Sequence, residues 1–103
     1  MPESALDLQP RHLETVRKIL QNWIPGRAVW AFGSRAKGTA KTYSDLDLAV
    51  ISDVPLDLNV FGALKEAFSE SDLPFKVDVV DWAATKQPFR DIIERDRLVV
   101  QAG

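Results

Sequence analysis

The sequence predicts a mixed α/β domain in which helices pack on one face of a small mixed sheet and leave carboxylates on the other face or at its edge. Two observations lead to this fold class. Amphipathic segments with helical spacing alternate along the chain with short apolar runs of strand length. The chain has 103 residues, of which 46% are hydrophobic, which is enough for one core. We therefore expect a single domain over residues 1–103.

The first half of the chain is predicted to form one helix and two strands. Apolar residues recur at helical spacing over Pro10–Trp23, and Pro25-Gly26 ends this helix. Ala28–Phe32 is a short apolar run that predicts a buried strand. Leu46–Ile51 predicts a second strand, and the loop between the two strands carries basic residues.

The second half continues the alternation of helices and strands. A helix is predicted over Leu58–Phe68, and Asp57 is suited to cap its N-terminus. A third strand is predicted over Phe75–Val80. A helix that follows Pro88 and a short apolar strand, Leu98–Val100, complete the expected order of elements.

Composition and charge limit the classes of function. The chain has no cysteine, which excludes disulfides and thiolate metal sites and makes the cytoplasm the expected compartment. The N-terminus lacks the features of a secretion signal, and no apolar run approaches the roughly 20 residues that cross a bilayer, so we expect no membrane association. The formal net charge of −2 argues against binding to long nucleic acid, because such binding needs many basic residues.

A glycine turn and two nearby aspartates carry the strongest functional signal. Gly33 and Ser34 follow the first predicted strand, and Asp45 and Asp47 stand at the start of the second. Glycine lets a phosphate approach the backbone closely, and Ser34 adds a hydroxyl and an amide. Alternate residues of a strand project to the same side, so Asp45 and Asp47 point together while Leu46 points toward a core. Such carboxylates bind magnesium together with the phosphates of a substrate.

Asp78 is the candidate third carboxylate. Val77 and Val79 share one face of the third predicted strand, and Asp78 looks the other way. Two metal ions about 3.5–4 Å apart need a further acid to seat the ion that activates the attacking oxygen, so three acids suit two Mg²⁺ ions and in-line displacement at an α-phosphorus. Asp81 is a rival, but it would face oppositely in a regular strand and is suited to cap a helix that begins near Trp82.

These motifs resemble those of a known family. The segments Gly33–Gly38 (GSRAKG), Ser44–Asp47 (SDLD) and Val77–Asp81 (VDVVD) look like the motifs of the minimal nucleotidyltransferases (MNT) of the polymerase-β superfamily. More narrowly, the chain resembles the MNT antitoxins that are paired with HEPN ribonuclease toxins. The resemblance extends from the first helix to the final strand, and the Gly-Ser pair and all three acidic positions are filled.

The resemblance implies a nucleotidyltransferase fold and magnesium-dependent transfer of a nucleotidyl group, usually AMP from ATP. The implied site residues are Gly33, Ser34 and Arg35 for the nucleotide, and Asp45, Asp47 and Asp78 for catalysis and metal binding. In the members linked to HEPN proteins, the acceptor is a tyrosine of the toxin, and its modification blocks the RNase activity. The implied partners are therefore ATP and a cognate HEPN-type toxin.

Other interpretations of the same residues stay open. One alternative is a non-catalytic module that neutralises a partner by occlusion, and another is a nucleotidyltransferase that acts on a nucleic-acid end or a small molecule. Lys37 and Lys41 are either solvated or in contact with a triphosphate or a partner. A lone histidine, His12, lacks metal-ligand spacing and is expected at the surface. Trp23 and Trp30 are expected in the core rather than in a base-stacking site.

Overall fold

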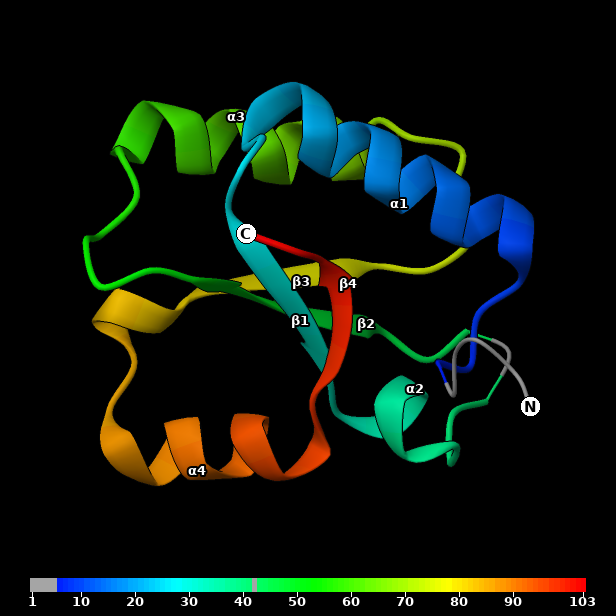
Figure 1. The fold of residues 1–103 in the computed structure, drawn as a ribbon. Coiled ribbons are helices and arrows are strands. Elements are labelled where there is room, and N and C mark those ends of the chain that lie inside the picture. Colours follow the sequence, from blue (N-terminus) through cyan, green and yellow to red (C-terminus); the bar gives the residue numbers. More distant parts are fainter. Residues whose placement is uncertain (1–5, 42) are drawn as a thin grey trace.

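The structure is a computed structural model and describes residues 6–41 and 43–103. Helices and strands alternate as the sequence predicts (Figure 1). The elements in chain order are α1 (Pro10–Trp23), β1 (Ala28–Phe32), α2 (Ser34–Lys37), β2 (Leu46–Ile51), α3 (Leu58–Ser69), β3 (Val77–Asp81), the 3₁₀ turn η1 (Trp82–Ala84), α4 (Gln87–Asp96) and β4 (Leu98–Gln101). The third strand thus begins at Val77 rather than at the predicted Phe75. Among the described residues, no helix has the length and apolar character needed to cross a membrane.

The four strands form one mixed sheet in the order β3-β2-β1-β4. β1 lies antiparallel to both β2 and β4, whereas β2 and β3 are parallel and are connected through α3. The register pairs Phe32 of β1 with Asp47 of β2, and it pairs Asp47 with Asp78 of β3. The last residue of β1 therefore meets the first residues of β2 and β3 at one end of the sheet.

Helices lie on both faces of the sheet, which corrects the prediction that they pack on one face only. α1 and α3 lie over one face, and α4 lies on the opposite side (Figure 1). The face under α1 and α3 holds the larger core, in which Leu20 and Leu48 are fully buried. A smaller buried cluster joins Ile93 of α4 to Phe32 and Ala49 of the sheet. Helical spacing identified α4 in the sequence but could not fix the face that it covers.

Local sequence signals explain where the helices begin and end. Asp57 caps α3, because its Oδ1 accepts hydrogen bonds from the backbone N–H groups of Asn59 (2.8 Å) and Val60 (3.4 Å). Pro10 is the first residue of α1, where its missing N–H group has no intrahelical partner to lose. Gly26 follows α1 with a φ of +80°, a left-handed turn that ends the helix.

The expectation that Trp23 lies in the core is wrong. Trp23 is the last residue of α1 and is 47% exposed. The next residue, Ile24, is 3% exposed and joins the core in its place. Trp30 is partly buried on the side of α4, where its ring packs edge-on against Trp82 with the centroids 5.6 Å apart.

Candidate active site

A glycine turn follows β1 at the end of the sheet where β2 and β3 begin. Gly33 has a φ of +78°, a backbone conformation that residues with a Cβ rarely adopt. Space imposes a second requirement, because a Cβ on Gly33 would collide with Oδ2 of Asp47. The turn leads directly into the short helix α2, whose first residue is Ser34. Glycine therefore lets the turn and the Asp47 carboxylate lie in close contact.

The predicted acids gather beside this turn. Asp47 and Asp78 are neighbours in the parallel pairing of β2 and β3, and both are partly buried. Asp45 is exposed and lies immediately before β2. Strand alternation puts Asp47 on the same side of the sheet as Ala49, which packs in the cluster under α4, whereas Leu48 is buried on the opposite side. The carboxylates thus continue, toward the glycine turn, the row of residues on which α4 packs.

The Asp47 carboxyl group has a perturbed pKa. Partial burial raises the pKa of Asp47 above its usual value, and the negative charges of Asp78 and Asp45 raise it further. The Asp47 carboxylate is thus close enough to those of Asp78 and Asp45 to be repelled by both. A divalent cation would relieve this repulsion, and three carboxylates supply the hard oxygen ligands that magnesium prefers. The donor set therefore fits a magnesium ion.

The acids are neighbours, but they do not form a complete metal cage. Within residues 6–41 and 43–103, no group of three or more histidine, aspartate or glutamate side chains is arranged to hold a metal ion by itself. Magnesium is normally bound by one or two carboxylates together with water and substrate phosphates. Asp45, Asp47 and Asp78 therefore fit a magnesium ion that arrives with a nucleotide better than a permanent structural ion.

Arg35 lies in α2 and is buried, with 6% of its surface exposed. Its Nε donates to the backbone oxygen of Ser44 (3.0 Å), and its Nη1 donates to the backbone oxygen of Asp7 (2.8 Å). The guanidinium also lies 4.3 Å from the centre of the Phe75 ring. Because Ser44 directly precedes Asp45, Arg35 fixes the segment that presents this acid. Its binding to a nucleotide stays a prediction.

Asp81, the rival third acid, has a structural role. Its Oδ1 accepts a hydrogen bond from the backbone N–H of Ala83 (3.2 Å), and its Oδ2 accepts one from the N–H of Leu56 (3.0 Å). The prediction that Asp81 caps the following helical turn is confirmed. Asp78, by contrast, lies next to Asp47 in the register and remains the candidate for the third acid.

The other residues that the sequence analysis singled out lie in different surroundings. Lys37 and Lys41 are exposed on and after α2. Trp82 belongs to η1 and packs against Trp30 on the side of the sheet that α4 covers. His12 is partly buried on α1 rather than fully at the surface.

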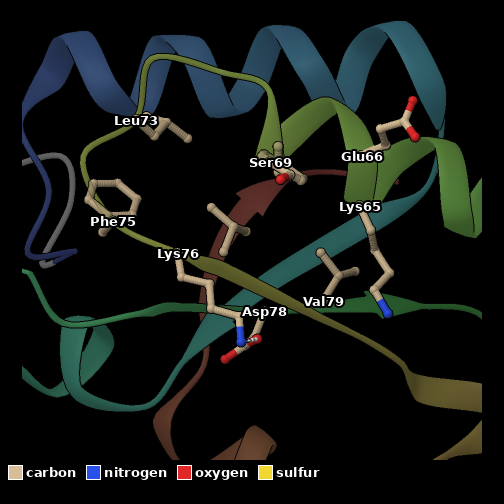
Figure 2. Close-up of a pocket in the computed structure, with 10 residues that line it drawn as sticks. Lys65, Glu66, Ser69, Leu73, Phe75, Lys76, Asp78 and Val79 are labelled. Carbon is tan, nitrogen blue, oxygen red and sulfur yellow. Dashed lines mark ion pairs between the residues drawn. The ribbon is translucent and has the colours of Figure 1, made fainter.

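A groove of about 700 Å³ lies beside Asp78, between α3 and the outer strand β3 (Figure 2). Apolar side chains such as Leu73 and Val79 line it together with two lysines, Lys65 and Lys76. Nζ of Lys76 lies 3.6 Å from Oδ1 of Asp78. Sequence reasoning missed both lysines. The one available signal was the position of Lys76 two residues before Asp78, which places both on the same side of an extended segment.

Comparison with known proteins agrees with this fold. The family model for polymerase beta nucleotidyltransferases matches residues 14–102. Over 98 residues, the chain is 56% identical to a Haemophilus influenzae protein named probable protein adenylyltransferase MntA. This match covers 95% of the chain and 86% of the Haemophilus protein.

Solved structures with the same fold come from toxin–antitoxin systems. A crystal structure of a toxin–antitoxin with AMP-PNP contains a chain that is 25% identical, with a TM-score of 0.74 over 88% of this chain and 73% of that chain. A tri-AMPylated HEPN toxin of Shewanella oneidensis in complex with an MNT antitoxin gives 21% identity and a TM-score of 0.69, over 93% of this chain and 74% of that chain. The latter similarity shows the fold alone.

Proposed function

This chain belongs to the polymerase beta nucleotidyltransferase family and is an MntA-like adenylyltransferase, and from this premise we propose that it transfers AMP from ATP to a hydroxyl group of a partner protein. One observation carries the proposal. The register of the sheet places Asp47 beside Asp78, and the Gly33 turn lies against the Asp47 carboxylate. A phosphate-binding turn and a group of acids are thereby available to the same triphosphate.

Each site residue has a proposed role. Gly33 and Ser34 bind the triphosphate through the backbone and the serine hydroxyl. The positive φ of Gly33, which has no Cβ, lets a phosphate approach the backbone of the turn closely. Asp45 and Asp47 hold Mg²⁺ together with the phosphates, and Asp78 completes the site on the acceptor side. When bound there, Mg²⁺ neutralises phosphate charge and makes the acceptor hydroxyl more acidic.

The proposed reaction is a single displacement. The acceptor hydroxyl oxygen attacks the α-phosphorus of ATP, and a new bond forms between that oxygen and the phosphorus. The bond between the α-phosphorus and the oxygen that bridges to the β-phosphate breaks, and pyrophosphate leaves on the opposite side. The hydroxyl proton passes to the Asp78 carboxylate and from there to solvent. AMP is thereby esterified to the acceptor.

The proposed acceptor is a tyrosine of a cognate HEPN ribonuclease toxin, so that the chain acts as an antitoxin in the cytoplasm. The names of its relatives support this proposal. The 56% identical relative is named a probable protein adenylyltransferase, and the 25% identical structural neighbour comes from a toxin–antitoxin structure. The neighbour with AMP-PNP supports ATP as the nucleotide.

Labelling with ATP that carries ³²P in the α-phosphate tests the proposed function. The wild-type chain should transfer label to the HEPN toxin only when Mg²⁺ is present. Asp45→Asn and Asp47→Asn should reduce transfer by about 1,000-fold or more while the proteins remain folded, because they remove metal-binding charge. Asp53→Asn is the matched control, since Asp53 is an exposed aspartate in the loop after β2. Full transfer by the Asp45→Asn/Asp47→Asn double variant would contradict the proposal.

A second candidate is a module that neutralises its partner by occlusion, which would not require the metal-binding carboxylates. The same two variants separate the candidates. An occluding module would neutralise the toxin equally well with Asp45→Asn and Asp47→Asn, whereas an adenylyltransferase would lose neutralisation together with transfer. Measuring toxin RNase activity beside the labelling decides between them.

A further inference from the structure

The order of the strands indicates the side from which an acceptor would approach the proposed site. Gly33 follows β1, Asp47 lies on β2 and Asp78 lies on β3, so these groups follow one another across the sheet. In-line displacement needs the attacking oxygen and the leaving pyrophosphate on opposite sides of the α-phosphorus. With the triphosphate tail at the Gly33 turn, the acceptor must approach from the side of β3. β3 is the outer strand of the sheet on that side.

The groove beside β3 borders this path at the outer edge of the sheet: it lies on the α3 side, with Val79, whereas strand alternation puts the Asp78 carboxylate on the other side of the same edge strand. It has a volume of about 700 Å³ and is bounded by α3, by the segment that leads into β3, and by β3 itself. Leu73 and Val79 contribute apolar lining, and Ser69 adds a hydroxyl group. Figure 2 shows the side chains of Lys65 and Lys76 extending toward the side of the groove where Asp78 lies. The groove thus combines an apolar lining with a basic rim next to the third acid.

The basic rim is available to a ligand. Lys76 is exposed and Asp78 is only partly buried, with side-chain exposures of 73% and 43%. Exposed ion pairs of this kind contribute little stability, so the pair separates at small cost. Figure 2 shows Glu66 directed away from the two lysines. Once a cation neutralises Asp78, the net charge of the rim is positive and favours an acidic ligand.

The backbone of β3 offers a second recognition element. The backbone N–H of Leu46 donates to the oxygen of Lys76 (2.9 Å), so Lys76 and its alternates in β3 turn their backbone groups toward β2. Val77 and Val79 therefore direct their N–H and C=O groups toward the outer side, where the described part of the chain places no further strand. An extended segment can pair with such an edge.

We propose that the groove between α3 and β3 binds the acceptor segment of the partner protein, an extended stretch that pairs with the outer edge of β3. The segment presents its hydroxyl residue at Asp78, an apolar side chain to the groove lining and an acidic side chain to Lys65 and Lys76. This inference rests on the proposed function, because it supplies the site through which the protein acceptor reaches the α-phosphorus.

Steady-state kinetics with two matched double variants test this assignment. Lys65→Glu/Lys76→Glu reverses the charge of the groove rim. Lys18→Glu/Lys86→Glu makes the same change in net charge at exposed lysines outside the groove. With the HEPN toxin as acceptor, the rim variant should raise the KM for the toxin by about tenfold. The KM for ATP and the MgATP-induced rise in Tm should stay unchanged. Added salt should raise the KM for the toxin in the wild type but not in the rim variant.

The outcomes separate this inference from the proposed function. An unchanged KM for the toxin in the rim variant, or an equal rise in both double variants, would overturn the groove assignment while AMP transfer itself stands. A rise in the KM for ATP of the same size would also overturn it, because the rim would then serve the nucleotide. If the wild type binds MgATP but labels no toxin, the proposed function fails first, before any variant is compared.

Discussion

The two faces of the sheet are formed by the same alternating strands but have different roles. On the face under α1 and α3, residues such as Leu48 are apolar and fully buried. On the other face, Ala49 and Val80 pack in the cluster on the side of α4, but the same rows end in the carboxylates of Asp47 and Asp78. One face is therefore a continuous core, and the other face is a core for only part of its length.

The difference shows how one strand supplies both stability and chemistry. Burial of apolar side chains stabilises the fold, whereas partial burial of a carboxylate beside two others destabilises it. The raised pKa of Asp47, caused first by burial and then by Asp78 and Asp45, is the sign of that destabilisation. Burial of the apolar face thus offsets the destabilisation that the clustered carboxylates cause on the other face.

Leu48→Ala tests the apolar face and should have the largest effect on stability. Leu48 is fully buried, so removal of its side chain should lower the free energy of unfolding by about 3–4 kcal/mol in urea denaturation. Leu58→Ala is the matched control, since Leu58 is 84% exposed and its truncation should cost less than about 0.5 kcal/mol. Equal losses in the two variants would contradict the assignment of faces.

Gly33→Ala tests the contact between the turn and the acidic face. The new Cβ requires a strained φ and collides with the Asp47 carboxylate, so we expect a loss of about 2–3 kcal/mol of stability and about 100-fold in AMP transfer. Gly38→Ala is the control, because Gly38 has a φ of +77° but open space around its Cβ position. The Gly38→Ala variant should lose stability but retain AMP transfer. Loss of transfer in both variants would assign the effect to α2 rather than to Asp47.

Asp81→Ala separates a structural aspartate from a catalytic one. The variant removes the acceptor for the N–H groups of Ala83 and Leu56 and should cost about 1–2 kcal/mol of unfolding free energy with AMP transfer retained. Asp78→Ala should show the reverse, with transfer lost and stability nearly unchanged. Retained transfer in the Asp78 variant would remove it from the proposed site.

Asp47→Asn should stabilise the metal-free protein, and its effect on stability should be the smallest of the four substitutions. The folded state raises the pKa of Asp47, so its ionised form destabilises the fold at neutral pH and this cost disappears as pH falls through the raised pKa. We expect Tm to rise by about 2–4 °C at pH 7, since solvent screens part of the repulsion, and the gain to vanish in acid. A Tm gain that is constant with pH would contradict this cause.

Much of the fold could be predicted because its signals are local. Pro10, Pro25 and Asp57 mark helix ends through their own backbone chemistry, and strand alternation alone predicted that Leu46 points toward the core. Features that depend on contacts between distant segments could not be predicted in this way. The packing of α4 on the second face is the clearest of these.

Two features of the site could not be predicted from the sequence for the same reason. The burial of Arg35 depends on Asp7, Ser44 and Phe75, which come from three separate segments. The groove at Asp78 forms only where α3 packs across the start of β3, so Lys65 gave no signal of its own. Acidic residues that share a strand are visible in a sequence, whereas a groove between elements is visible only in the fold.

The most direct test of the account is the position of bound metal. Crystals grown with Mn²⁺ and a non-hydrolysable ATP analogue should show anomalous scattering at the carboxylates of Asp45 and Asp47, with the triphosphate on the Gly33 turn and Asp78 beside the α-phosphate. A metal and nucleotide bound elsewhere on the protein, with these three carboxylates free of both, would contradict the central claim.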